Sequence, residues 1–224
     1  MKKFSQLKFK KIDLEKIKSE FSSLVDEFKN SKTFEEQDKA LTKIFKYSDE
    51  LQTNMTIGEI RYTLDTRSKV NQKNQEMIDE VSPHISALFN SFEKELVKAK
   101  FIDDLKKKWG SYLFEMTKQS LECFDEKIIP ELQEINRLSS EYTKLISSAQ
   151  IDFHGEICNL SQLSKHTQSA DRQERKEASK LFADFFNENN DKIGEIYDKM
   201  VKTRTKMAQK LGYKNFVELG YKNL

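Results

Sequence analysis

The sequence has 224 residues, and its 39 basic and 37 acidic side chains leave a formal net charge of +2. Both signs are spread along the whole chain and most basic residues are lysine, which argues against a nucleic-acid partner. With 34% charged residues but only six glycines and two prolines, the composition favours long amphipathic helices over strands and predicts a mainly α fold.

The first two predicted helices are each preceded by a capping residue. Residues 14–28 carry apolar side chains at three- and four-residue spacing, from Leu14 to Phe28, and Asp13 is placed to cap them. Thr33 and Glu36 have the spacing of a capping box ahead of a second helix, which we expect to run towards residue 64.

A third apolar stripe extends from Met77 to Leu96 and is interrupted by Pro83. Two interpretations remain open here, since Pro83 either occupies the first turn of a new helix or kinks a continuous one. His84 lies beside this break, where a lone histidine is typical of a structural or solvated position. The first hundred residues are predicted to form a long helical hairpin with an extra helix at its start.

Trp109 and Gly110 have the pattern of a helix end with a left-handed glycine, and we expect a subdomain boundary there. Two further helices follow before residue 150. Beyond the segment 151–160, Asp171 is expected to start one helix, and Gly212 to stop another whose apolar stripe includes Tyr197 and Val201. Arg204 lies within that stripe, so we expect it to form an interhelical ion pair.

Familiar catalytic motifs are absent from the sequence. It contains no HExxH, the metallopeptidase helix in which two histidines bind zinc and the glutamate acts as base. The three histidines, at positions 84, 154 and 166, have no spacing that builds such a turn. No two glycines are close enough for a phosphate-binding loop or a GxSxG elbow. We therefore assign no catalytic, cofactor-binding or metal residue in this chain.

The segment IDFHGEICNL, residues 151–160, is the one stretch that gathers zinc-ligand types. On one extended strand, His154, Glu156 and Cys158 would point the same way. A two-residue hairpin turn at His154 and Gly155 explains the glycine better, because such turns need positive φ at both positions. We therefore favour the hairpin, which pairs Ile151 with Cys158 and places His154 at the tip.

The two cysteines, Cys123 and Cys158, form no CxxC pair, which favours free thiols in a reducing compartment. The N-terminus lacks the apolar core of a signal peptide, and no segment approaches 18 uninterrupted apolar residues. We expect a soluble cytoplasmic protein without a membrane partner, and interpret Met1 as a true start.

From Ser147 to its end, the sequence resembles oligoendopeptidase F, a family of thimet oligopeptidase-like zinc metallopeptidases. The matching features are the short strand pair, the motif NLSQL, the pattern SADRQER and the helix pair VKTRTKMAQKLGYKNFVELGY. The family's hairpin tip commonly carries Asp-Gly, where this chain has His154 and Gly155, and both pairs suit the turn. The first 145 residues resemble the family only in having long helices in a suitable order.

The resemblance implies a zinc enzyme that hydrolyses short peptides inside a helical channel. In the family, HExxH and a later glutamate ligand lie downstream of the matched region, so zinc and catalysis would come from a missing C-terminal half. The implied division is a helical hairpin region over 1–109, a helical subdomain with a β-hairpin over 110–188, and the first helices of the catalytic domain over 189–224.

Two functional hypotheses follow. In the first, the chain is an inactive part of the peptidase, and its last helix, with Phe216, Leu219 and Tyr221, exposes apolar surface to the missing half. The alternative is a stand-alone helical interaction module that binds a peptide or protein partner. The arginines Arg172, Arg175 and Arg204 are candidates for holding the two halves together.

Overall fold

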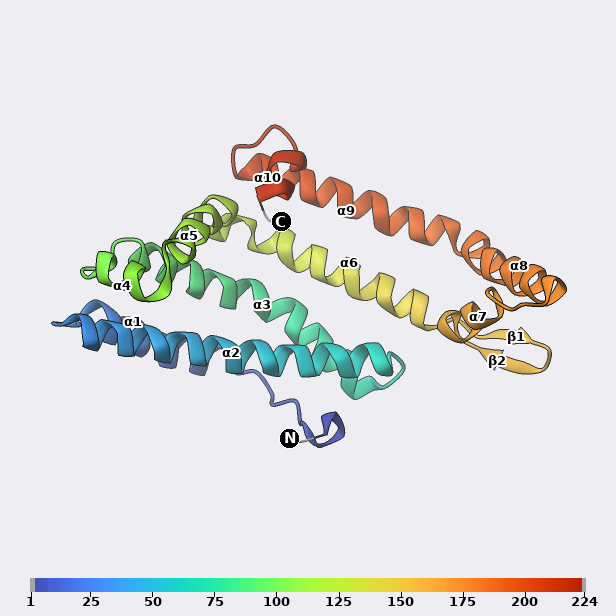
Figure 1. The fold of residues 1–224 in the computed structure, drawn as a ribbon. Helices are drawn as coiled ribbons and strands as arrows, with labels where there is room; N and C mark the ends of the chain where they lie inside the picture. Colours follow the sequence, from blue (N-terminus) through green and yellow to red (C-terminus); the bar gives the residue numbers. More distant parts are fainter. Residues whose placement is uncertain (1–2, 223–224) are drawn as a thin grey trace.

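The computed structural model describes residues 3–222, so Met1 lies outside the described residues. Within that range, ten α-helices and one two-stranded antiparallel sheet build an elongated array, which confirms the expected mainly α fold with one β-hairpin. Figure 1 shows long helices stacked side by side, with α6 (Ile129–Ser147) lying between α3 (Lys69–Leu96) and α9 (Asn190–Lys210).

Three N-terminal helices form the first layers of this stack. Asp13 caps α1 (Leu14–Lys29) through the backbone N–H of Lys16. The hydroxyl of Thr33 accepts from the N–H of Glu36 at the start of α2 (Phe34–Leu64), which reaches the expected end. Because aromatic and aliphatic faces of α1, α2 and α3 meet, they bury a common core, which includes Phe21, Phe28, Leu41, Ile44 and Phe92.

Pro83 lies inside α3, which is one continuous helix. The ring removes the N–H that would bond to the carbonyl of Asp79, four residues earlier. The Nδ2 of Asn136, on α6, donates to that carbonyl oxygen at 3.1 Å. The Nε2 of Gln133 donates to the next carbonyl, that of Glu80, at 2.9 Å. Side chains of α6 therefore supply donors at the break in the α3 ladder and tie the two helices together.

Gly110 separates α4 (Ile102–Trp109) from α5 (Ser111–Cys123). Its φ of 85° has the expected positive sign, but its ψ of 147° lies outside the left-handed helical region, so the predicted left-handed cap is wrong. The chain turns sharply and begins α5 at the next residue. Phe114 of α5 is buried in the same core as Phe28 of α1. The subdomain boundary at this point stays a prediction.

The other end of the stack holds the β-hairpin, formed by β1 (Ile151–Phe153) and β2 (Glu156–Cys158), together with α7 (Leu160–His166) and α8 (Arg172–Glu188). From there α9 returns along α6 (Figure 1). Gly212, with φ of 93°, ends this return, and α10 (Phe216–Lys222) folds back onto α9 and α5.

Candidate functional site

The hairpin turn has the backbone geometry that its sequence predicts. His154 and Gly155 adopt φ values of 55° and 87°, and His154 is the one non-glycine residue with positive φ among residues 3–222. Ile151 pairs with Cys158, Asp152 with Ile157 and Phe153 with Glu156, as expected. The Oδ1 of Asp152 also accepts from the N–H of Gly155 at 2.8 Å. The hairpin interpretation is therefore confirmed.

The three zinc-ligand types in this segment do not converge. Cys158 is 1% exposed and packs with Phe153 and Leu163, whereas Glu156, two residues earlier on the same strand, is exposed. The Nε2 of His154 lies 2.9 Å from Glu177 on α8. Across residues 3–222, no three His, Cys, Asp or Glu side chains are grouped so that they could hold a metal ion. The described residues do not fit a zinc ion.

The histidines of this end serve to attach the hairpin to α8. The Nδ1 of His166 lies 2.7 Å from the Oε1 of Glu174, and its ring is 4.5 Å from that of Phe153. The ring of His154 stacks on that of the preceding residue, Phe153, with 4.3 Å between the two centroids. Hydrogen bonds from Ser169 and then His166 hold the pKa of Glu174 below its usual value. These contacts pack the hairpin and α7 against α8. They do not direct unpaired ligand atoms of the two histidines toward one shared metal position.

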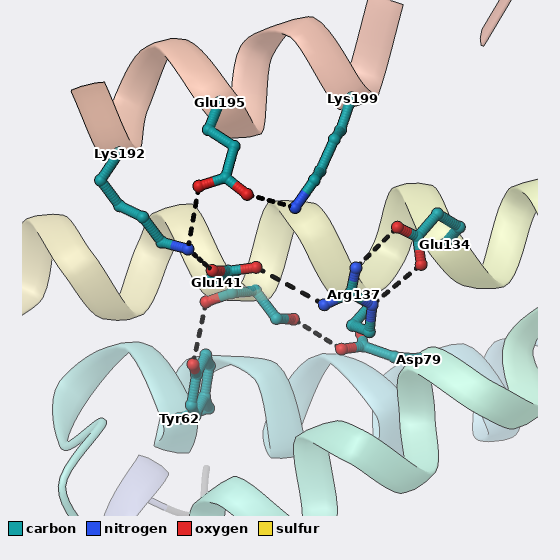
Figure 2. Close-up of polar contacts among 9 residues, drawn as sticks. Tyr62, Asp79, Glu134, Arg137, Glu141, Lys192, Glu195 and Lys199 are labelled. Atoms are coloured by element: carbon teal, nitrogen blue, oxygen red, sulfur yellow. Dashed lines mark hydrogen bonds and ion pairs between the residues drawn. The ribbon is translucent and has the colours of Figure 1, made fainter. Parts of the chain in front are cut away.

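Between the helical layers lies a polar connection, drawn in Figure 2. The Oδ2 of Asp79 on α3 accepts from the hydroxyl of Ser140 on α6 at 2.6 Å. The phenol of Tyr62 on α2 donates to the carbonyl of Ser140 at 3.0 Å. Burial raises the pKa of the Asp79 carboxyl, while hydrogen bonds from Ser140 and Gln75 act in the opposite direction. Three helices are joined through the backbone and side chain of one serine.

Ion pairs continue this connection from α6 to α9. Figure 2 shows Lys192 reaching Glu141, with 2.6 Å between Nζ and Oε1, and Arg137 bridging Glu134 and Glu141 on α6 itself. These side chains are substantially exposed, so each pair contributes about 0–1 kcal/mol. Of these pairs, the one between Lys192 and Glu141 joins α9 to α6.

Glu131 on α6 is different because its side chain is only 3% exposed. The Nζ atoms of Lys210 and Lys206, both on α9, lie 2.8 and 3.0 Å from its two carboxylate oxygens. Burial alone would raise the pKa of Glu131, but the hydrogen bonds from Lys210 and Lys206 hold it below the usual value. A buried carboxylate that needs two cations from the neighbouring helix fixes the α6–α9 register.

The outer surface of α9 and α10 carries large apolar side chains that face solvent. Tyr197 is 70% exposed and Tyr221 is 74% exposed, and Val201 and Val217 are also exposed. The expectation that α10 exposes apolar surface holds for Tyr221 but not for Leu219, which is fully buried, and Phe216 is half-buried. We refer to Tyr197, Val201, Val217 and Tyr221 as the α9–α10 surface.

Sequence periodicity did not indicate that Tyr197 and Val201 are exposed, because the apolar stripe of α9 is wider than the face that packs. At about 100° per residue, Tyr197, Val201 and Ala208 fall on the same edge of the stripe. Ala208 is buried, in a cluster with Leu219 of α10, while Tyr197 and Val201 are not covered. The one sequence feature that could have indicated this exposure is the width of the apolar stripe of α9.

Arg204 does not form the expected interhelical ion pair with any of the described residues. Its guanidinium lies over the ring of Phe216, with 5.5 Å from Cζ to the centroid, because the turn at Gly212 brings α10 back across α9. The Nη1 of Arg175 donates to the carbonyls of Ser169 and Ala170, so this arginine acts locally. Arg172 is exposed at the start of α8.

Comparison with known proteins gives consistent results. Residues 4–124 match the model of the peptidase M3 N-terminal domain. A structure of PZ peptidase A with an inhibitor is 40% identical, with a TM-score of 0.93 over 99% of this chain and 39% of that one. A protein described as an oligoendopeptidase F from Bacillus anthracis str. Ames is 36% identical, with a TM-score of 0.93 over 98% of this chain and 40% of that one.

A third structure, of another protein described as oligoendopeptidase F, is 35% identical, with a TM-score of 0.94 over 99% of this chain. The chain spans about two fifths of the length of each of these structures. A search of curated proteins found no match.

Proposed function

The chain belongs to the M3 peptidase family through its N-terminal domain, and from this premise we propose that it is the non-catalytic N-terminal part of a zinc metallo-oligoendopeptidase. The proposal is supported mainly by the comparison with PZ peptidase A. The two structures match over almost all of this chain but over only 39% of PZ peptidase A. The remaining length of such relatives would supply the parts that this chain lacks. The proposed substrates are short peptides, cleaved in a channel that these helices help to wall.

The chain is proposed to be inactive on its own. Its sequence contains no HExxH, so it lacks the two histidines and the glutamate that bind zinc and act as base in that motif. The residues grouped at the hairpin do not replace them, since His154 is paired with Glu177 and Cys158 is buried. Zinc and the general base would therefore come from a segment outside these 224 residues.

The α9–α10 surface is the proposed contact with that segment. Two exposed tyrosines and two exposed valines lie on these last two helices, Tyr197 and Val201 on α9, and Val217 and Tyr221 on α10. The proposed division fits this placement, since residues 189–224 would be the first helices of the catalytic domain. Glu131 and its two lysine partners would hold α9 on the N-terminal helices at a fixed register.

We also propose a cytoplasmic location for the enzyme. Among residues 3–222, every helix is too short or too polar to cross a lipid bilayer.

A peptidase assay of the purified 224-residue chain, supplied with Zn²⁺ and internally quenched peptides, tests the proposal. We expect no turnover above that of a protein-free blank, and substoichiometric zinc in protein purified without a histidine tag. Turnover that co-elutes with the chain and disappears on chelation would overturn the proposal. The matched sample is a His154→Ala variant, which should behave identically, because His154 is not proposed to bind zinc.

A further inference from the structure

Residues 7–12 form neither helix nor strand, and they connect the short 3-10 helix η1 (Phe4–Gln6) to α1. This segment is drawn in dark blue in Figure 1. Asn54 of α2 binds Lys10 through both of its main-chain polar groups. The Oδ1 of Asn54 accepts from the N–H of Lys10, and its Nδ2 donates to the carbonyl of Lys10, both at 2.8 Å. Because these bonds use only main-chain atoms of the segment, they do not depend on the side chain at that position.

A second contact with α2 has the spacing of a nearly extended chain. The Nη2 of Arg61 donates to the carbonyl of Leu7. Asn54 and Arg61 are seven positions apart in α2, which is about 10 Å along a helix. Leu7 and Lys10 are three positions apart, which is also about 10 Å in an extended chain. Side chains alternate accordingly, since Leu7 and Phe9 are half-buried, whereas the lysine after each of them is exposed.

Gly58 makes room for the aromatic side chain of this segment. It lies inside α2, and a Cβ added there would lie 3.0 Å from the ring of Phe9 and 2.6 Å from Cδ1 of Ile78 on α3. Glycine inside a helix is less stable than alanine, so α2 gives up helix stability for this close approach. Phe9 packs against the apolar cluster that includes Ile12, Met55 and Ile78. The segment is therefore anchored by one aromatic ring.

The segment does not pack continuously on the helices beside it. A cavity of about 920 Å³ lies between it, α1 and α2. The lining includes Leu7 and Ile12, together with Ile17 of α1 and Leu51 of α2. The hydrogen bonds and the aromatic contact described above are therefore separate points of attachment. A segment held in this way can detach locally while the long helices keep their own packing.

We propose that Asn54, Gly58 and Arg61 form a binding site on α2 for an extended peptide segment that carries an aromatic side chain. Residues 4–10, the N-terminal strap, occupy this site in the structure, and an extended segment of another polypeptide can take their place. The partner places an aromatic ring beside Gly58, and the main-chain N–H and carbonyl of its next residue bind Asn54. The carbonyl two residues before the ring binds Arg61. This inference is independent of the proposed function and requires neither zinc nor hydrolysis.

Fluorescence anisotropy with a labelled peptide of residues 4–10, FSQLKFK with an amidated C-terminus, tests this site. The peptide is titrated with the full 224-residue chain, as wild type and as the Phe9→Ala variant. In wild type, the attached N-terminal strap competes at an effective concentration on the order of millimolar. In Phe9→Ala the strap lacks its anchor, so we expect this variant to bind the peptide at least about tenfold more tightly than wild type does.

A matched peptide and two further variants assign the contacts. The peptide with the Phe9→Ala change keeps every main-chain group, and it should bind the Phe9→Ala chain at least about tenfold more weakly than the unchanged peptide. In the same background, Asn54→Asp should weaken binding of the unchanged peptide several-fold, because a carboxylate cannot donate to the Lys10 carbonyl. Asn187→Asp, at an exposed position of α8, should leave binding unchanged.

Thermal melting reports whether each variant folds. If Phe9→Ala does not fold, Lys10→Pro supplies the comparison, because it removes the N–H that binds Asn54 and leaves the space beside Gly58 intact. Failure of both strap variants to fold would overturn the proposal, since the segment would then be a fixed part of the core. The proposal is also overturned if the peptide binds wild type and variant equally or binds neither, if both peptides bind equally, or if Asn54→Asp has no effect.

Discussion

The Nδ2 of Asn136 donates to the carbonyl oxygen of Asp79, the acceptor that Pro83 deprives of its backbone donor in α3. The same Nδ2 lies 3.1 Å from the hydroxyl of Ser82. A proline that would be costly inside an isolated helix is thus accommodated by a side chain of the neighbouring helix. The relationship makes the α3–α6 contact specific, because sliding α6 by one turn would remove the donor.

Replacing Asn136 should therefore destabilise the chain. Asn136→Ala leaves the Asp79 carbonyl without a donor, and we expect a loss of about 1–3 kcal/mol in the free energy of unfolding, measured by urea titration. In a Pro83→Ala background, where the backbone N–H returns, the same substitution should cost less. Asn187→Ala, at an exposed position of α8, is the control. An equal cost of Asn136→Ala in both backgrounds would contradict this explanation.

Glu131 is predicted to make a pH-dependent contribution to stability. Because its folded pKa is lowered, the contribution is present above the unfolded pKa, about 4.3, and is lost as pH falls through the folded value. At neutral pH, Glu131→Gln should destabilise the chain by about 1.5–3 kcal/mol, since the bonds to both lysines are weakened. The difference between wild type and variant, measured by chemical unfolding, should shrink below about pH 4.

The matched control for Glu131 is Glu188→Gln, at the exposed end of α8. It should change stability by less than about 0.5 kcal/mol at either pH. A Glu131 effect that is the same at pH 7 and pH 3 would show that packing, and not the two ion pairs, is responsible.

Two glycine substitutions should change the stability of the chain in opposite directions. Gly155→Ala forces alanine into a φ of 87° at the hairpin turn and should destabilise the chain by about 1–2 kcal/mol. Gly194→Ala lies in the helical interior of α9, where an added Cβ meets no atom within 4 Å, and should stabilise it by about 0.5–1 kcal/mol. Thermal melting measures both. If Gly155→Ala melts no earlier than wild type, the turn does not need its positive φ.

The α9–α10 surface should be detectable in the chain alone. The double variant Tyr197→Ser and Tyr221→Ser is expected to reduce binding of an apolar fluorescent dye and any self-association seen by size-exclusion chromatography, with little change in melting temperature. Leu64→Ser, at an exposed position near the end of α2, is the control. A wild-type chain that is a clean monomer without dye binding would instead favour the independent interaction module.

Much of this fold could be predicted because its local signals agree with its packing. The capping residues Asp13, Thr33 and Asp171 all accept from helix N-termini, and the turn at His154 and Gly155 fixes the register of the hairpin. Such features depend on residues close in sequence, so a single amino-acid sequence is sufficient to predict them.

The features that sequence did not reveal depend on contacts between distant segments. Pro83 was compatible with a helix start or a continuous helix, and the donors that decide the question come from α6. Arg204 faces Phe216 only because Gly212 reverses the chain.

We propose that this chain is one part of a zinc peptidase whose catalytic residues lie outside its 224 residues. Sequencing the DNA that follows the codon for Leu224 tests it most directly. The account predicts an HExxH motif within a few hundred codons, in the same frame or a shifted one, followed by a further glutamate ligand. A downstream sequence with no HExxH in any frame would contradict it.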